Sequence, residues 1–282
     1  MRRRPSFARI LGGGIASAGR GLTRLFGSRI GTRAAAHASA ALAPIASIAT
    51  SRGKLRFWCD SEMSAKRALG ALRQEPETLA WIEQYIQPGD HLWDVGANIG
   101  VYGLYACLRE NVTATCFEPV ASTFAILVRN AALNSLAERF APLSIALSDS
   151  NGVVRLYLSN TESGSSMHAL NNPSNVQGPF EVAGVQSVPA VRGDKLAADF
   201  GVRAPQHLKI DVDGHELQVL EGMGALLDQV RSVWIEMTPS SEATGENARI
   251  RAVLNVHSLF EEPFAAAKHG RNRLFVRRNE SR

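Results

Sequence analysis

Cysteine is scarce in this chain of 282 residues, and the three that occur are not grouped. None forms the CxxC pair that is typical of redox motifs and zinc sites. A chain without a framework of paired cysteines is typical of a reducing compartment. We expect Cys107 and Cys116, which lie in apolar segments, to be small buried side chains and not nucleophiles.

Acidic residues are absent from the first fifth of the chain. Eleven of the 31 Arg and Lys residues precede Asp60, which is the first acid. The remainder therefore carries 20 basic residues against all 26 acidic ones, so its net charge is negative. The high pI of 9.4 belongs to the N-terminal segment alone. Because nucleic-acid-binding domains need a basic face, we expect no nucleic-acid partner.

Long apolar runs are also missing from the basic segment, residues 1–52, which we treat as an arm preceding a domain at 53–282. The segment 34–51 is mostly alanine and is too weakly apolar to predict a membrane span. The glycines at 12–14 predict an interrupted helix. Three interpretations of the arm remain: a flexible solvated tail, which we favour, an anchor on an anionic membrane surface, or a targeting peptide.

Short apolar runs alternate with helical patterns through the rest of the chain. Strands are predicted at 92–95, 112–117, 142–147, 153–158, 207–212 and 232–237, and helices at 81–86, 99–108, 124–131 and 217–227. Residues 264–278 predict two antiparallel strands around a turn at 269–272. The alternation predicts an α/β fold with a parallel sheet, whose ligands lie beyond the carboxyl ends of the strands.

The first strand runs into a glycine turn, "DVGANIG", at 94–100. Gly96 and Gly100 are present, but Asn98 stands near the place of the middle glycine of a dinucleotide fingerprint. That glycine lets the backbone approach a pyrophosphate, so its loss disfavours NAD and FAD. The Gly-Lys-Ser/Thr ending of a phosphate loop is missing as well. An NAD-dependent oxidoreductase stays as an alternative.

The glycine turn and the acids at the strand ends are suited to a nucleoside without phosphates. Glu118 ends the second strand and is placed to accept hydrogen bonds from both ribose hydroxyls. Asp94, before the turn, would neutralise an ammonium or order a water. S-adenosylmethionine combines adenine, ribose and an ammonium and has no phosphate. The alternative is that both acids are ordinary strand-end residues, and a non-catalytic nucleoside-binding module also remains open.

Several stretches of the chain resemble the FkbM family of S-adenosylmethionine-dependent methyltransferases. They are "EPETLAWIEQYIQPGDHLWDVGANIGVYG" (75–103), "FEP" (117–119), "ALSDSNGVVRLY" (146–157), "HLKIDVDGHELQVLEGM" (207–223) and "NRLFVRR" (272–278). Asp213 departs from the pattern, because the family more often has Glu at that position.

The resemblance implies the class I methyltransferase fold, a Rossmann-like, mostly parallel sheet of seven strands with helices on both faces and the last strand antiparallel. It implies that the methionine and ribose side of the cofactor is lined by Asp94, Gly96, Asn98 and Gly100. Glu118 would hold the ribose, and Ala146 and Leu147 would lie near the adenine. The activity implied is O-methylation of a sugar, glycolipid or polyketide-type acceptor.

The segment "KIDVDGHE" (209–216) places several polar residues where a strand ends and a helix begins. A hydroxyl acceptor must lose its proton during transfer, and a general base contributes about 10²–10⁴-fold to the rate. His215 is a candidate by its ordinary pKa, and Asp211 is the rival or orients the hydroxyl. Alternatively, these residues only satisfy the first turn of the helix. We expect no metal, although Asp211, Asp213 and Glu236 are oxygen ligands suited to a divalent cation.

A polar segment at 160–180 is long enough to be a lid over the acceptor. Ser165, Ser166 and His168 are candidate contacts there, and solvated loop residues are the alternative. We expect a small-molecule, glycan or glycolipid acceptor, and a cytoplasmic location, because S-adenosylmethionine is a cytosolic cofactor. The basic arm would add a peripheral contact with a membrane surface.

Overall fold

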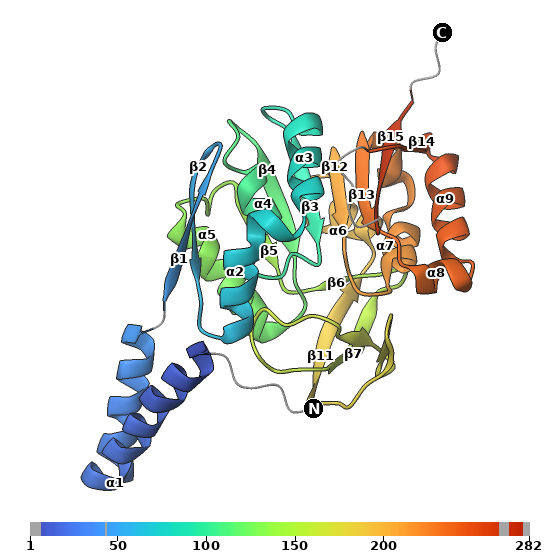
Figure 1. Ribbon diagram of the computed structural model, residues 1–282. Coiled ribbons are helices and arrows are strands. Elements are labelled where there is room, and N and C mark those ends of the chain that lie inside the picture. Colours follow the sequence, from blue (N-terminus) through green and yellow to red (C-terminus); the bar gives the residue numbers. More distant parts are fainter. Residues whose placement is uncertain (1–6, 43, 265–270, 279–282) are drawn as a thin grey trace. The chain divides into compact units, whose positions relative to one another are not determined.

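The computed structural model describes residues 7–42, 44–264 and 271–278 (Figure 1). The chain forms two compact units, Met1–Pro44 and Ile45–Arg282. The first unit contains α1 (Phe7–Leu42), which is interrupted at Gly27, where φ is 76° and ψ is 163°. The glycines at 12–14 do not interrupt the helix, contrary to expectation, because each costs a helix only about 1 kcal/mol. None of the described helices is both long and apolar enough to cross a membrane.

The second unit begins eight residues before the expected boundary at Gly53. A hairpin of β1 (Ile45–Thr50) and β2 (Gly53–Trp58) pairs in full register, from Ile45 with Trp58 to Thr50 with Gly53. Leu55 and Phe57 of β2 are completely buried in the core of this unit. Residues 45–52 therefore belong to the body, because their backbone hydrogen bonds are made with a buried strand.

A sheet of seven strands forms the centre of the second unit (Figure 1). Its order is β14 (Leu259–Glu262), β15 (Asn272–Arg277), β13 (Ser232–Glu236), β12 (His207–Ile210), β3 (His91–Val95), β4 (Thr113–Phe117) and β5 (Phe140–Leu143). The strands β13, β12, β3, β4 and β5 pair in parallel, whereas β15 is antiparallel to both of its neighbours. This topology confirms the class I methyltransferase fold.

Helices cover both faces of the sheet, and each face has its own apolar core. One face carries α2 (Glu62–Gln74), α3 (Pro76–Tyr85), α4 (Val101–Ala106) and α5 (Ala121–Leu133), and the other carries α6 (Gly193–Phe200), α7 (Glu216–Met223) and α9 (Glu246–Val256). Alternate side chains of each strand face opposite ways, so Leu92 enters the first core while Trp93 and Val95 enter the second. Cys107 and Cys116 are buried in the first core, as expected.

A second sheet of four strands contains the strand expected at 153–158, which is β7, together with strands that were not predicted. It consists of β6 (Ala146–Leu147), β11 (Gly184–Val191), β7 (Gly152–Leu158) and β8 (Ala169–Leu170). The strand expected at 142–147 is therefore divided, since its first half joins the large sheet as β5 and its second half pairs with β11. The remaining short elements are β9 (Ser174–Asn175), β10 (Gly178–Pro179), η1 (Gly224–Gln229) and α8 (Pro239–Ala243).

The last antiparallel pair among the described residues is formed by β14, at 259–262, and β15. An antiparallel end to the fold is thus confirmed. Residues 265–270, which hold most of the expected first strand and turn, lie outside the described residues. Leu259 is completely buried against the second core and thereby fixes β14 there.

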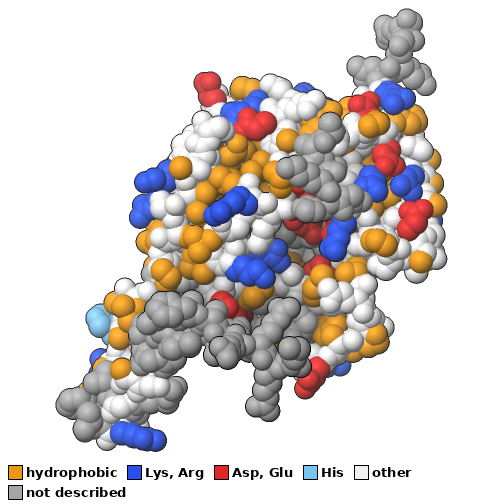
Figure 2. Space-filling view, viewed as in Figure 1, with side chains coloured by type: hydrophobic (Ala, Val, Ile, Leu, Met, Phe, Trp, Pro, Cys, Tyr) orange, Lys and Arg blue, Asp and Glu red, His pale blue; other side chains and the backbone are white. Residues whose placement is uncertain are grey.

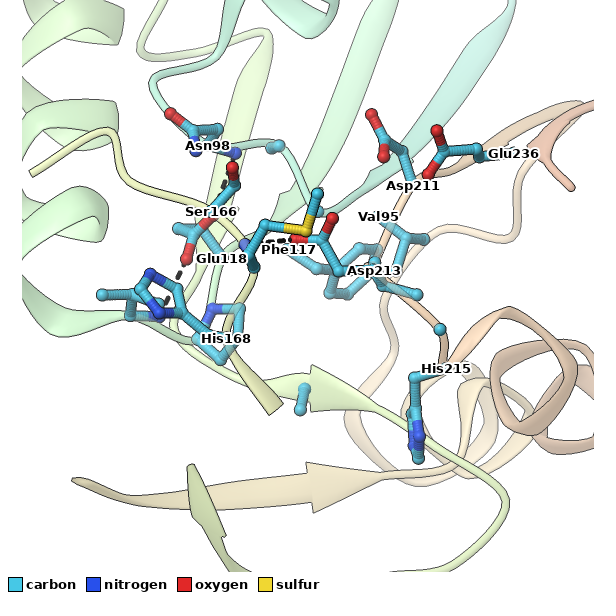
Figure 3. Close-up of a pocket in the computed structure, with 18 of the residues that line it drawn as sticks. Val95, Asn98, Phe117, Glu118, Ser166, His168, Asp211, Asp213, His215 and Glu236 are labelled. Atoms are coloured by element: carbon cyan, nitrogen blue, oxygen red, sulfur yellow. Dashed lines mark hydrogen bonds between the residues drawn. The ribbon is translucent and has the colours of Figure 1, made fainter. Parts of the chain in front are cut away.

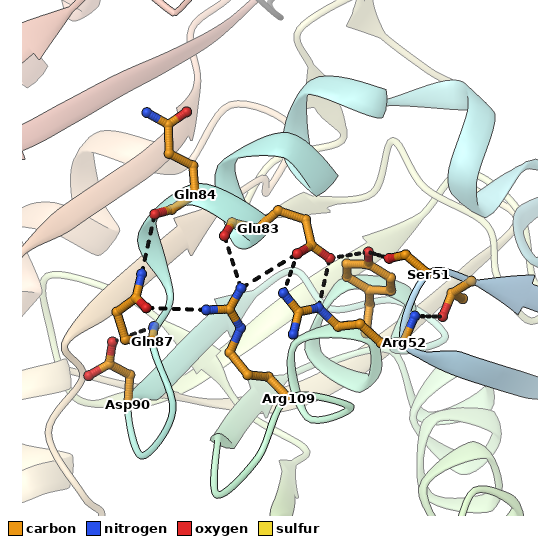
Figure 4. A network of polar contacts seen from close by, with 9 residues as sticks. Ser51, Arg52, Glu83, Gln84, Gln87, Asp90 and Arg109 are labelled. Atoms are coloured by element: carbon orange, nitrogen blue, oxygen red, sulfur yellow. Dashed lines mark hydrogen bonds and ion pairs between the residues drawn. The ribbon is translucent and has the colours of Figure 1, made fainter.

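One polar network fastens the hairpin to the helices (Figure 4). Arg52, in the hairpin turn, donates from Nε to Glu83 Oε1 of α3 at 2.7 Å and forms an ion pair with the same carboxylate. Tyr105 of α4 donates to Glu83, and its hydroxyl also lies 3.1 Å from Ser51 Oγ. Arg109 donates to the Glu83 backbone oxygen at 2.9 Å. The hydrogen bond from Arg52 is the main cause that lowers the pKa of Glu83 to about 2.

We predict that Glu83→Gln lowers the free energy of unfolding by about 1 kcal/mol, a value kept small because the carboxylate is 35% exposed. Since the pKa of Glu83 is about 2 in the folded protein against 4.5 ordinarily, this stabilisation is present above pH 4.5 and is lost as the pH falls toward 2. Thermal unfolding of both proteins between pH 2 and 7 measures it. The exposed Glu110→Gln is the control, and an equal difference between wild type and Glu83→Gln at every pH would contradict the prediction.

Candidate active site

A cavity of about 350 Å³ lies at the carboxyl ends of β3, β4, β12 and β13 (Figure 3). Its charged lining consists of Arg67, Glu75, Glu118, Lys209, Asp211, Asp213, Glu236 and Arg271. Acids outnumber bases in this set by five to three. Figure 2 shows acidic side chains grouped near the middle of one face, with Lys and Arg side chains beside them. The cavity is therefore suited to a ligand that carries positive charge.

The turn after β3 depends on two glycines. Gly96 has a φ of 80°, and a Cβ atom there would lie 2.0 Å from the backbone oxygen of Asp211. Gly100 has a φ of 90°, and a Cβ atom would lie 2.6 Å from Leu127. A side chain is excluded at both positions by backbone conformation and by contact. The backbone of the turn at Gly96 therefore packs directly against the backbone of Asp211, which follows β12.

Glu118 is buried beside this turn. Its Oε2 accepts a hydrogen bond from the backbone N–H of Asn98 at 2.9 Å, and its Oε1 accepts one from Val120 at 2.8 Å. Each carboxylate oxygen has a second lone pair, so both remain able to accept from a ligand. Burial raises the pKa of Glu118 to about 7, although the two N–H groups lower it.

The expected cofactor residues divide into two groups. Gly96, Asn98, Glu118, Ala146 and Leu147 line the cavity. Asp94 and Gly100 are not part of the lining, since Asp94 is completely buried behind it and Gly100 packs on Leu127. Asp94 Oδ2 accepts from the backbone N–H of Gly103 at 3.1 Å. These two residues thus support the turn from behind.

Lys209 links the turn to the opposite rim. Its ammonium lies 3.6 Å from Asp94 Oδ1, 3.3 Å from Asp211 Oδ2 and 5.2 Å from the ring centre of Tyr102. Burial alone would lower the pKa of Lys209, but the carboxylates of Asp211, Asp94 and Glu75 raise it above its ordinary value. The lysine therefore stays charged and is paired with both carboxylates. Neither Glu75 nor Tyr102 was expected at the site, because nothing in their local sequence marks them.

Three carboxyl groups form the rim on the far side of Lys209. Asp211 and Glu236 follow adjacent parallel strands, in which Ile210 pairs with Ile235, and Figure 3 shows the two side chains beside each other. Burial, followed by the charge of Asp211, raises the pKa of Glu236 to about 8 and that of Asp213 to about 6. Among the described residues, no three His, Cys, Asp or Glu side chains are arranged to hold a metal ion.

His215 lies at the edge of the cavity, before α7. Its Nε2 is 3.1 Å from Ser148 Oγ, and Figure 3 shows it apart from Asp211 and Glu236. Burial lowers the pKa of His215. Its neighbour Glu216 accepts hydrogen bonds from the backbone N–H groups of Val212 and Gly214, at 3.1 Å in each case. Glu216 therefore organises the backbone of this segment and does not face the ligand space.

The polar segment expected as a lid does cover part of the cavity. We call residues 163–168 the roof. Arg67 Nε donates to the Gly164 backbone oxygen at 3.3 Å, and Asn98 Nδ2 donates to that of Ser165 at 3.0 Å. Asp213 Oδ2 accepts from the backbone N–H of Met167 at 2.7 Å. The roof is thus fastened to α2, to the glycine turn and to the acidic rim.

The sequence pattern of the Methyltransferase FkbM domain matches residues 94–263. This chain belongs to the FkbM methyltransferase family. A hexuronic acid methyltransferase, AglP of Haloferax volcanii, is 32% identical over 168 residues, which are 59% of this chain and 63% of AglP. The 31-O-demethyl-FK506 methyltransferase FkbM of Streptomyces tacrolimicus is 32% identical over 184 residues, 57% of this chain and 70% of that enzyme. The chain thus spans less than two thirds of the length of AglP.

Similarity to solved structures is more distant. The magnesium protoporphyrin IX methyltransferase ChlM of Synechocystis PCC 6803, solved with bound S-adenosylmethionine, is 10% identical, with 77% of this chain and 85% of that chain covered and a TM-score of 0.43. Family membership and sheet topology are the stronger findings. They place this chain in a methyltransferase family and not among the NAD-dependent oxidoreductases.

S-adenosylmethionine is the cofactor of this methyltransferase, and the residues of the cavity fit it. The glycine turn offers close approach to backbone, Glu118 offers free lone pairs for hydroxyl groups, and the excess of acids suits a cation. Carboxyl groups whose pKa values are raised by burial gain from a cationic ligand, because it favours their charged form.

We predict that the affinity for S-adenosylmethionine rises as the pH rises from 6 to 8. The carboxyl groups of Asp213, Glu118 and Glu236 have pKa values of about 6, 7 and 8, so Asp213 is half ionised and the other two are mostly neutral at pH 6, and all three ionise further across this range. Calorimetric titration measures the change. S-adenosylhomocysteine, which lacks the sulfonium charge, should show a weaker dependence.

The matched variant for this titration is Glu118→Gln, which is similar in shape and cannot ionise. We expect it to bind S-adenosylmethionine about tenfold more weakly, or worse, at pH 8 and to flatten the pH profile, because it loses charge-assisted hydrogen bonds. An affinity that stays constant or falls as the pH rises would contradict the electrostatic account of the cavity.

Proposed function

We propose that this FkbM-family chain transfers the methyl group of S-adenosylmethionine to a hydroxyl group of a sugar, glycolipid or polyketide-type acceptor. The observation that carries the proposal is the pairing of a cofactor turn with an open carboxylate, Asp211, in one cavity. The names of the two relatives support it, since one specifies a hexuronic acid and the other an O-demethylated FK506.

The cofactor would be held by residues on one side of the cavity. Glu118 would accept hydrogen bonds from the ribose, Gly96 and Asn98 would contact the methionine side, and Ala146 and Leu147 would pack near the adenine. When bound, S-adenosylmethionine supplies a methyl group on a sulfonium, which leaves as a neutral thioether. Since that leaving group is already good, holding the reactants in line supplies most of the catalysis, worth roughly 7–11 kcal/mol.

Asp211 is the base that the geometry favours. Its side chain is 33% exposed to the cavity, and only one of its oxygens faces Lys209, at 3.3 Å. The acceptor hydroxyl would give its proton to Asp211 while its oxygen forms the new bond to carbon. His215 remains the second candidate, although its Nε2 already contacts Ser148 and it lies away from the rim.

Methylation of a hydroxyl is tested with the purified protein and S-adenosylmethionine labelled in its methyl group. We expect label to enter at least one acceptor among a hexuronic acid, a glycolipid and a macrolide carrying free hydroxyls. The product should be a methyl ether, which survives alkaline treatment. A product that releases methanol in alkali would be a carboxylate ester and would refute the hydroxyl as the acceptor group.

The two candidate bases are separated by Asp211→Asn and His215→Gln. We predict that Asp211→Asn lowers kcat by about 10²–10⁴-fold, since it removes the proton acceptor. Its affinity for S-adenosylmethionine should change by only a few-fold, measured by calorimetry. His215→Gln should retain kcat within about tenfold of wild type, as expected of a residue that is not the base. The reverse pattern would assign the base to His215.

A further inference from the structure

The roof contains two buried polar atoms that have no hydrogen-bond partner among the described residues. Ser165 Oγ and His168 Nε2 are buried and make no hydrogen bond to any described residue, and both side chains line the cavity. Ser165 is only 4% exposed. Buried polar groups in folded proteins nearly always have a partner, so two such atoms on the wall of one cavity indicate a ligand that supplies one.

The hydrogen bond at Nδ1 of His168 determines which of its two ring nitrogens carries the proton. The backbone N–H of Ser159 donates to His168 Nδ1 at 3.2 Å. A ring nitrogen that accepts a hydrogen bond carries no proton, so the neutral ring carries its proton on Nε2. Burial lowers the pKa of His168 to about 4, which keeps the ring neutral at physiological pH. His168 is therefore a hydrogen-bond donor toward the cavity and not a base.

The roof lies on the side of the cavity that holds Glu118. Asn98 connects them, because its Nδ2 donates to the backbone oxygen of Ser165 at 3.0 Å while its backbone N–H donates to Glu118 Oε2 at 2.9 Å. Figure 3 shows His168 and Glu118 on one side and Asp211 and Glu236 on the other. Both atoms thus belong to a segment that Asn98 joins to Glu118, the residue expected to hold the ribose.

We propose that Ser165 Oγ and His168 Nε2 bind the ribose hydroxyl oxygens of the cofactor and, together with Glu118, complete its recognition. A hydroxyl group donates one proton and also accepts hydrogen bonds on its oxygen. An ionised Glu118 only accepts, so it uses the hydroxyl protons and leaves the oxygen lone pairs free. The Nε2–H of His168 and the hydroxyl of Ser165 supply the missing donors. The inference rests on the role proposed for Glu118.

The test is a binding cycle that needs no acceptor. S-adenosylhomocysteine and its 2′-deoxy and 3′-deoxy analogues are titrated into wild type, His168→Phe and Ser165→Ala by calorimetry. In wild type, at least one deoxy analogue should bind about 3- to 10-fold more weakly, as expected for one lost hydrogen bond. Each variant should bind S-adenosylhomocysteine more weakly by a similar factor. It should then lose less than wild type does when the corresponding hydroxyl is removed, because the roof contact is already gone and only the hydrogen bond to Glu118 is left to lose.

Controls separate a lost contact from a damaged fold. His168→Gln retains an N–H donor and should recover part of the affinity. His257→Gln and Ser150→Ala are matched changes at residues that do not line the cavity, and both should bind as wild type does. Thermal unfolding checks that each variant is folded. If His168→Phe does not fold, Ser165→Ala and its response to the deoxy analogues still decide the matter.

Two results would overturn the inference. One is that both roof variants bind S-adenosylhomocysteine with wild-type affinity. Ser165 and His168 would then contact the acceptor or only support the fold. The other is equal affinity of wild type for S-adenosylhomocysteine and both deoxy analogues. Failure to methylate any hydroxyl acceptor, with the binding cycle as expected, would refute the proposed reaction and leave the roof inference standing.

Discussion

A single buried ammonium holds the two halves of the active site together. Lys209 on β12 pairs in register with Asp94 on β3, and its Nζ lies between the carboxylates of Asp94 and Asp211. Removing one partner of a buried ion pair costs about 3–5 kcal/mol, because the remaining charge is left uncompensated. Lys209 therefore adds a charged link between the glycine turn and the acidic rim, beside the backbone pairing of β3 with β12.

The cavity beyond this lysine is electrostatically incomplete without a ligand. Burial raises the pKa values of Glu118, Asp213 and Glu236, so part of the rim is neutral at physiological pH in the protein alone. Such an arrangement does not favour the stability of the folded chain, and it is typical of a functional site. A sulfonium cation restores the charged form of these groups. Part of the binding free energy of the cofactor thus comes from the attraction between its sulfonium and the carboxylates that ionise when it binds.

Segments far apart in the sequence complete the site. The hairpin β1–β2 packs on the first core and is fastened by Glu83, while the roof crosses from the second sheet to the glycine turn through Asn98. Both are additions to the seven-stranded sheet, and both act through hydrogen bonds to residues that the sheet has already placed. The sheet positions the residues of the cavity, and the roof covers part of it.

Local sequence determined the sheet strands, the glycine turn and the acids at strand ends, because alternation, helical spacing and glycine at positive φ are short-range properties of the chain. The alternation of apolar and polar residues did not predict those strands whose position depends on the strand they pair with. Residues 142–147 belong to two sheets, β11 contains Pro189 and has only two buried residues, and β1 was assigned to the arm, since each is a strand through its partner and not through its own residues. Tertiary structure alone placed Asp94 behind the cavity wall and brought Glu75 and Tyr102 to Lys209. It also left Ser165 Oγ and His168 Nε2 without a hydrogen-bond partner among the described residues. Those outcomes depend on which side chains meet across the fold, and distance along a sequence does not contain that information.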